Sequence, residues 1–152
     1  MLKPGSLLWG QEMCLTDKFD PDDSDHRTIK DELKLGIALH EIATFSEVDR
    51  ALEAAGFVVM EAADRDNGEG HGIPWYGPLE SRSGTLRNVF RRTPLGRQAI
   101  LAGVRMAEAF RFFPRGSSAV VRMMDRTANA YVAGGKTGIF TPLYCFVARK
   151  PG

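Results

Sequence analysis

The architecture is set by the stretch Leu2-Lys3-Pro4-Gly5-Ser6-Leu7-Leu8-Trp9-Gly10-Gln11-Glu12-Met13-Cys14-Leu15-Thr16-Asp17. Its Lys-Pro-Gly start predicts a turn, because proline fixes φ and glycine permits a positive φ. The apolar run that follows predicts a strand, and the strand stops at a cluster of polar residues. Ligands of open α/β sheets collect just beyond the carboxyl ends of strands. Glu12, Thr16 and Asp17 are therefore the first candidates for contact with a substrate, although a buried strand followed by a solvated acidic loop fits the same pattern.

The composition is that of one globular domain, with 152 residues of which 43% are hydrophobic and 26% charged. The formal net charge is only +1, so no global field attracts nucleic acid. His26, His40 and His71 lie in polar or turn contexts without ligand spacing, which argues against a metal site. No apolar run approaches the roughly 20 residues that span a bilayer, and no signal-peptide pattern opens the sequence.

Helical and extended patterns alternate after the first strand. Ser24 is the expected N-cap of a helix over residues 25–35, and Ser46 the expected N-cap of a second helix that ends at Gly56. Residues 57–60 predict a second strand. If the two strands are parallel, a right-handed crossover is the default connection.

A Pro-rich segment in the middle of the chain presents Trp75 and Tyr76 side by side. Proline keeps this backbone extended, and each of the two rings combines a large apolar body with one polar group. Such a segment either fills a core or lines an apolar ligand site.

Residues 86–131 are predicted to be mostly helical, with breaks near Pro94 and Pro114. Their apolar stripes, including Phe110 and Met124, are interpreted as core. Arginines on these helices form a basic surface, which is either simply solvated or suited to anionic lipid headgroups. Residues 139–149 predict a third strand, and Pro142 is expected at an edge or a bulge. Three strands are few for an α/β sheet.

Two groups of motifs resemble a known family. Leu2-Lys3-Pro4-Gly5 is similar to the turn before the fifth strand of class I S-adenosylmethionine-dependent methyltransferases. The Tyr-Glu-Trp-x-Met-Thr-Asp-x-Tyr-Asp motif of sterol C-24 methyltransferases is matched by Gln11-Glu12-Met13-Cys14-Leu15-Thr16-Asp17-Lys18-Phe19-Asp20, and their His-Arg-x-Ile-Lys segment by His26-Arg27-Thr28-Ile29-Lys30.

Further matches to the same family follow in the family's order to the end of the chain. They are Pro74-Trp75-Tyr76-Gly77-Pro78-Leu79, Arg92-Thr93-Pro94-Leu95-Gly96-Arg97, Val132-Ala133-Gly134-Gly135-Lys136, Phe140-Thr141-Pro142 and Ala148-Arg149-Lys150-Pro151. The resemblance implies an α/β fold: the C-terminal part of a Rossmann-like class I methyltransferase sheet, about three strands, with an inserted helical subdomain that faces the sterol.

The family transfers a methyl group from S-adenosylmethionine to the side-chain double bond of a sterol through a carbocation, which then loses a proton. Such a site needs an apolar cavity, aromatic faces and carboxylates to stabilise positive charge, and a base. The resemblance implies charge stabilisation or binding of the sterol hydroxyl by Glu12 and Asp17, contact with substrate by Thr16, and an apolar wall of Trp75 and Tyr76.

Two departures from the family pattern affect this expectation. Gln11 and Met13 replace Tyr and Trp on either side of Glu12, and Ile37, Ala38 and His40 replace the usual residues after Gly36. Activity or substrate preference is therefore expected to differ from that of typical members.

The family's glycine-rich cofactor loop is not in this sequence, so residues 1–152 are expected to be the sterol-binding C-terminal domain, with S-adenosylmethionine bound mainly by a missing N-terminal half. The family further implies a homo-oligomer at the cytosolic face of the endoplasmic reticulum or in the cytoplasm, with peripheral membrane association left open. Two alternatives remain: a non-catalytic sterol- or lipid-binding module, and a subunit that completes its sheet with a separate N-terminal chain.

Overall fold

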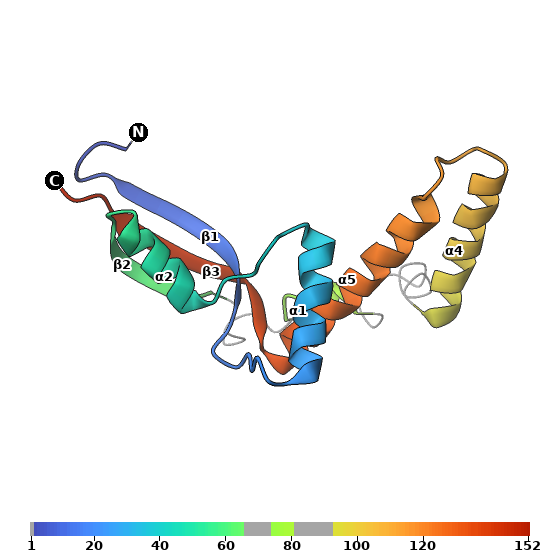
Figure 1. Cartoon of the computed structure of the whole chain (residues 1–152), viewed down its shortest axis with the longest axis horizontal. Helices are drawn as coiled ribbons and strands as arrows, with labels where there is room; N and C mark the ends of the chain where they lie inside the picture. Colours follow the sequence, from blue (N-terminus) through green and yellow to red (C-terminus); the bar gives the residue numbers. More distant parts are fainter. Residues whose placement is uncertain (1, 66–73, 81–92) are drawn as a thin grey trace.

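The computed structural model describes residues 2–65, 74–80 and 93–152. Its centre is a three-stranded sheet in the order β1 (Leu7–Leu15), β3 (Phe140–Arg149), β2 (Val58–Asp64) (Figure 1). β3 is antiparallel to both neighbours, so β1 and β2 are parallel to each other. The expected α/β fold with three strands is confirmed in the described part of the chain, and β2 extends four residues beyond the predicted strand.

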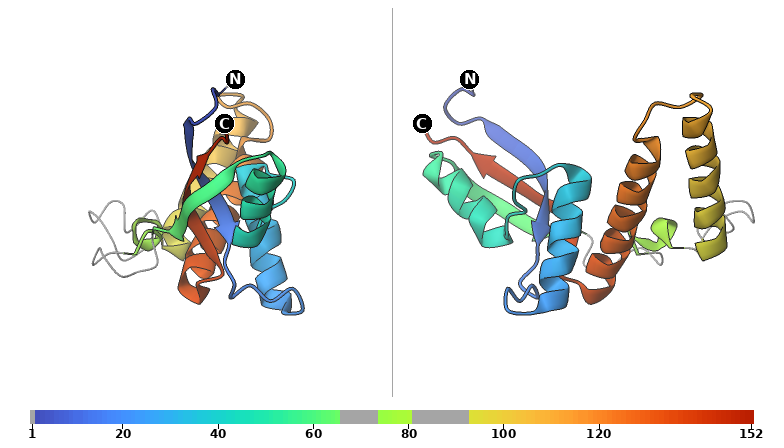
Figure 2. Two further views of the ribbon diagram at one scale, coloured as in Figure 1. Left: turned by 90° about the vertical axis from the view of Figure 1, so that its left-hand side faces the viewer. Right: turned by 45° about the vertical axis from the view of Figure 1, so that its right-hand side comes forward.

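In the described residues the sheet is accompanied by α1 (Ser24–Ile37), α2 (Phe45–Ala54), the short 3₁₀ helix η1 (Gly77–Leu79), α4 (Pro94–Ala109) and α5 (Ser117–Thr137). α2 lies against β2, and α1 packs across α5. Figure 2 shows that α4 and the first half of α5 form a hairpin that projects away from the sheet. The expected helical residues 86–92 and the acidic loop 66–72 lie outside the described residues.

The caps of the first two helices differ from those predicted. Asp23, not Ser24, caps α1, because its carboxylate accepts hydrogen bonds from the main-chain amides of Asp25 and His26 at 2.7 and 3.2 Å. Thr44, not Ser46, caps α2 in a capping box with Glu47. In both cases a neighbouring side chain with an acceptor oxygen takes the position that the apolar spacing assigned to serine.

Pro142 lies in the central strand of the sheet, not at its edge. The missing amide is tolerated because the pairing of β1 with β3 shifts register between Glu12 and Cys14, opposite Pro142. The Pro142 carbonyl still accepts a hydrogen bond from the Gln11 side chain at 3.0 Å. The predicted bulge is thus confirmed.

The core lies where the end of β1 meets α1, α5 and the start of β3. Its largest fully buried side chains include Leu15, Leu33, Ile42, Ile139 and Phe140, each at most 2% exposed. Residues from both ends of the chain contribute to this cluster.

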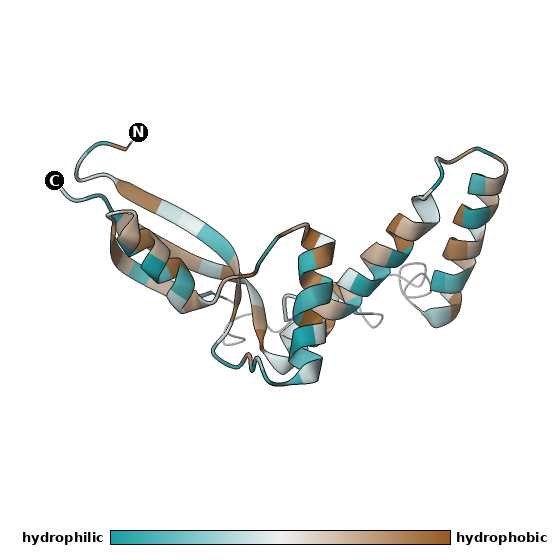
Figure 3. Cartoon of the chain, viewed as in Figure 1, coloured by the Kyte–Doolittle hydropathy of each residue, from teal (hydrophilic) through white to brown (hydrophobic). Residues whose placement is uncertain are grey.

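The interpretation of the later apolar stripes as core is wrong for their outer members. Phe110, Val120 and Met124 are 71%, 52% and 63% exposed. Figure 3 shows apolar residues along the projecting hairpin as well as around the core. A two-helix hairpin buries only the face that its helices share, so the helical periodicity is real but its other apolar residues face solvent.

The crossing of α1 and α5 depends on a glycine inside α1. A methyl group at Gly36 would lie 1.9 Å from the Thr127 hydroxyl oxygen, closer than atoms can approach. The helix expected over residues 25–35 runs through Gly36 to Ile37, and Ala38 closes it in the left-handed conformation, with φ 56°. The role of Gly36 is therefore close helix packing.

Gly36→Ala is expected to lower the free energy of unfolding by about 1–3 kcal/mol, because Thr127 must move out of a packed position. Gly103→Ala in α4 is the matched control: a methyl group there meets nothing within 4 Å, and the gain in helix propensity should stabilise by about 0.5–1 kcal/mol. Urea unfolding followed by circular dichroism measures both. Equal stabilisation by the two changes would contradict the packing role.

Candidate functional site

A cavity of about 430 Å³ opens at the carboxyl ends of β1 and β2. This volume is in the range of small-molecule sites. The walls come from five parts of the chain: the residues after β1, the start of α2, the end of β2, the segment before η1, and the end of α5 with the start of β3. β1 and β2 are parallel, so both end at this edge of the sheet. The sequence predicted a site at the end of the first strand and left the direction of the second strand open.

Four of the five sequence-predicted site residues line this cavity. They are Thr16, Asp17, Trp75 and Tyr76. Glu12 is not among them: it lies within β1, is exposed, and lines a separate hollow with Met13 and Leu39. The strand continues three residues past Glu12, which separates this carboxylate from Asp17.

The hydroxyl of Thr16 holds the end of β1 against the turn between α5 and β3. It donates a hydrogen bond to the Gly138 carbonyl at 2.6 Å and accepts one from the Lys18 amide at 3.2 Å. The Thr16 amide donates to the Ile139 carbonyl at 2.9 Å. Thr16 therefore fixes the main chain on which Asp17 is placed at the cavity.

Four aromatic rings form one cluster beside the cavity. Trp75 packs edge-to-face on Tyr76, Tyr131 and Phe140, with ring centroids 5.5, 5.9 and 5.9 Å apart, and Tyr131 packs on Phe140 at 5.5 Å. Edge-to-face pairs of this kind are favourable beyond the area they bury. Trp75 of the Pro-rich segment packs against the core, as one of the two alternatives predicted, and it also lines the cavity.

Two adjacent glycines of α5 make room for this cluster. A methyl group at Gly135 would lie 2.1 Å from the Tyr76 ring, and one at Gly134 would lie 3.1 Å from the Phe140 Cβ. The Tyr76 ring therefore rests directly on the main chain of α5. α5 continues past the predicted helical region, residues 86–131, and through both glycines to Thr137.

Asp64 and Phe45 are cavity residues that sequence reasoning missed. Asp64 ends β2, and one of its carboxylate oxygens accepts a hydrogen bond from the buried Thr141 hydroxyl at 2.8 Å. A longer predicted second strand would have placed Asp64 at a carboxyl end, in the position that drew attention to Asp17. Phe45 carried no sequence signal, because its place depends on the packing of α2.

Phe45 is held at the cavity wall by Tyr144 of β3. The two rings stack with centroids 4.3 Å apart at an interplanar angle of 14°. The Tyr144 hydroxyl donates to the Asp49 carboxylate at 2.9 Å, and burial together with this bond raises the pKa of Tyr144 well above its usual range. Tyr144 therefore stays neutral and acts as a fixed support between sheet and helix.

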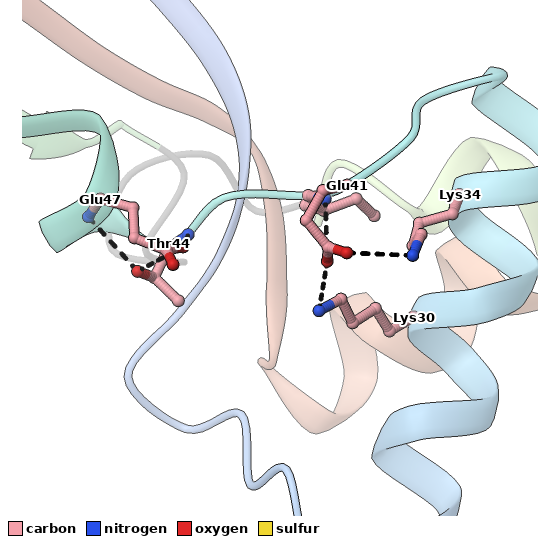
Figure 4. A network of polar contacts seen from close by, with 6 residues as sticks. Lys30, Lys34, Glu41, Thr44 and Glu47 are labelled. Carbon is pink, nitrogen blue, oxygen red and sulfur yellow. Dashed lines mark hydrogen bonds and ion pairs between the residues drawn. The ribbon is translucent and has the colours of Figure 1, made fainter. Parts of the chain in front are cut away.

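The connection from α1 to α2 is tied down by ion pairs and a cap (Figure 4). The Glu41 carboxylate binds the ammonium groups of Lys30 and Lys34 on α1, the latter at 3.0 Å. The hydrogen bond from Lys30 is the main cause that lowers the pKa of Glu41 to about 2. The Ile42 side chain that follows is buried in the core, so this connection sets where α2 begins.

Comparison with known proteins places these features in a family. A family model described as "Sterol methyltransferase C-terminal" matches residues 87–152. Over 151 residues the chain is 38% identical to cycloartenol-C-24-methyltransferase of Arabidopsis thaliana, a match that covers 99% of this chain and 44% of that protein. It is 36% identical over 157 residues to the sterol 24-C-methyltransferase of Saccharomyces cerevisiae, covering 99% of this chain and 41% of the relative.

The chain is therefore similar to sterol C-24 methyltransferases over nearly its whole length, and its last part to a model of their C-terminal region. This similarity confirms the resemblance seen in the motifs. The chain spans less than half the length of the curated relatives it matches. A solved structure described as a sarcosine dimethylglycine methyltransferase from Galdieria sulphuraria matches with a TM-score of 0.50 at 16% identity, over 99% of this chain and 43% of that one. At this identity the match supports the methyltransferase fold alone.

The loop after β1, residues 16–23, holds no glycine. Because the turn before β1 resembles the one before the family's fifth strand, this loop is not the one in which the family's glycine-rich cofactor turn is expected. Within the described residues, no three His, Cys, Asp or Glu side chains gather as metal ligands do.

Glu41→Gln is expected to destabilise the fold near neutral pH by less than about 1 kcal/mol, because the carboxylate is about half exposed and solvent screens its pairs. The folded-state pKa of Glu41 is depressed, so its contribution is present above the ordinary value of 4.5 and is lost as the pH falls towards about 2. Urea unfolding from about pH 7 down to pH 3 should show the difference from wild type shrinking with acid. A difference independent of pH, or one matched by Glu53→Gln, would contradict this account.

Proposed function

We propose that this chain is the sterol-binding C-terminal part of an S-adenosylmethionine-dependent sterol 24-C-methyltransferase, acting in sterol biosynthesis. The observation that carries the proposal is that Asp17 lines the same cavity as Trp75 and Tyr76, which lie far from it in sequence. An apolar wall and a carboxylate within one hollow are what a carbocation formed on an apolar substrate requires.

Within this proposal each cavity residue has a separate role. Trp75 and Tyr76 form the apolar wall and present aromatic faces to positive charge. Asp17 stabilises that charge or binds the sterol hydroxyl, and Thr16 positions Asp17. Asp64 is a second carboxylate of the same cavity, whereas Glu12 acts, if it contacts substrate, from the neighbouring hollow.

S-adenosylmethionine is proposed to bind mainly to residues outside this sequence. The partial coverage of the relatives supports this division. The complete enzyme is proposed to be a homo-oligomer at the cytosolic face of the endoplasmic reticulum or in the cytoplasm.

A second candidate function is a subunit that completes its sheet with a separate chain, or a sterol-binding module without catalysis. β1 is an edge strand of the described sheet, and Leu7 and Trp9 on it are 57% and 65% exposed. An uncovered apolar edge of this kind favours pairing with another strand. This observation favours the subunit over the free-standing module.

Titration with cycloartenol tests whether the cavity binds a sterol. Trp9 and Trp75 are the two tryptophans of the chain. The Trp9→Phe variant therefore keeps only Trp75, at the cavity, and the Trp75→Phe variant keeps only Trp9, away from the cavity. The fluorescence of the Trp9→Phe protein is expected to change saturably with cycloartenol, and that of the Trp75→Phe protein to stay constant. Saturable changes of equal size in both variants would show that the sterol binds elsewhere.

A chimera tests the catalytic part of the proposal. The chimera joins the N-terminal part of the Arabidopsis cycloartenol-C-24-methyltransferase, the part outside the alignment, to this chain. The assay measures methyl transfer from labelled S-adenosylmethionine to cycloartenol. Activity is expected, and Asp17→Asn should lower kcat by about 10²–10³-fold, as loss of an electrostatic stabiliser does. Asp22→Asn, in the same loop but away from the cavity, should leave kcat unchanged.

Two results would contradict this assignment of the catalytic carboxylate and the cofactor site. An active chimera unaffected by Asp17→Asn removes Asp17 from the chemistry, and a larger loss with Glu12→Gln moves the charged site to the neighbouring hollow. Transfer by the 152-residue chain alone would contradict the proposed division of the cofactor site.

A further inference from the structure

The tip of the α4–α5 hairpin, residues 110–115, carries an exposed aromatic cluster that nothing in the sterol cavity uses. Phe110, Phe112 and Phe113 are 71%, 81% and 49% exposed, and Met106, one turn before Phe110 on α4, is 62% exposed. Figure 1 shows this tip at the end of the molecule opposite the two termini. Large aromatic side chains are rarely left in water in such a group without a partner.

The tip is also basic. Arg111 and Arg115 lie within it, and Arg105 and Arg122 lie on the adjacent turns of the two helices, all four exposed. The acidic side chain nearest in sequence, Glu108, accepts a hydrogen bond from the Ser118 amide at 3.1 Å, and its bonds to Ser118 lower its pKa. That carboxylate is thus engaged at the start of α5, which leaves the arginines to set the charge of the tip.

The main chain of the tip is fixed rather than loose. Arg111 adopts a positive φ of 61°, its amide donates to the Glu108 carbonyl at 3.0 Å, and the Phe112 amide donates to the Ala107 carbonyl at 2.8 Å. These are the two hydrogen bonds of a Schellman motif, in which the left-handed residue is usually glycine. An arginine in this left-handed conformation lowers the stability of the fold relative to glycine. The strained residue, Arg111, lies between the exposed Phe110 and Phe112.

We propose that this tip docks the protein on anionic lipid surfaces, with the phenylalanines inserted at the headgroup boundary and the arginines paired with lipid phosphates. Charge complementarity selects this occupant, because a basic rim around an aromatic cluster matches the negative headgroup layer above an apolar interior. No helix of the described residues can cross a bilayer, which agrees with shallow insertion. This inference does not depend on the sterol cavity.

Cosedimentation of the full chain with phosphatidylcholine vesicles, with and without phosphatidylserine and free of sterol, tests the proposal. Binding is expected only with phosphatidylserine and should weaken as salt rises. Phe112→Ser with Phe113→Ser, and separately Arg111→Gln with Arg115→Gln, should each weaken it by roughly tenfold or more. Two controls should leave vesicle binding unchanged. They are Leu95→Ser, where Leu95 is 74% exposed at the far end of α4, and the remote pair Arg50→Gln with Arg65→Gln.

Arg111→Gly separates docking from folding. Glycine relieves the left-handed backbone, so this variant should melt at a higher temperature while binding anionic vesicles more weakly. Unchanged vesicle binding by both the phenylalanine pair and the arginine pair would overturn the proposal. A second result would also overturn it: analytical ultracentrifugation that shows a dimer of the wild-type chain and a monomer of the Phe112→Ser, Phe113→Ser variant. The tip would then bind a second copy of the chain. Cycloartenol binding reports on the cavity separately.

Discussion

The contact on which the described structure depends is that of the Tyr76 ring with the main chain of α5 at Gly135. Because no side chain stands there, the segment before η1 lies directly on the last turn of α5, and Trp75 reaches Tyr131 and Phe140. This one contact joins a segment from the middle of the chain to the final helix and strand. It also closes one wall of the cavity, so packing and site are set by the same residues.

The sheet supplies the other half of the site. β1 and β2 run parallel on either side of β3, so their carboxyl ends bring Asp17 and Asp64 to one edge, facing the aromatic wall. The hydroxyls of Thr16 and Thr141 fix these ends through hydrogen bonds to Gly138 and Asp64. The arrangement is polar where the strands end and apolar where the helices pack, which suits a large apolar ligand with one developing or fixed polar centre.

Features that depend on local chemistry could be predicted from the sequence. The turn before β1, the strand itself and the adjacent pair of aromatics followed from proline, glycine and apolar patterning. The choice between Asp23 and Ser24 as a cap was missed although it is local, because either side chain can accept these hydrogen bonds. The role of Gly36 was missed because it depends on tertiary context, the crossing of α1 with α5. Periodicity could not show that Phe110 lies on a projecting hairpin, nor could it show that β1 continues past Glu12 and separates it from Asp17.

The central claim is that a sterol occupies the cavity between Asp17 and the aromatic wall. Photo-cross-linking with a diazirine-bearing sterol, followed by peptide mapping of the labelled chain, tests it most directly. The account predicts that label falls on peptides that carry Trp75, Tyr76 or Phe140, and that excess unlabelled sterol competes it away. Label confined to residues 106–115, or to the hollow beside Glu12, would contradict it.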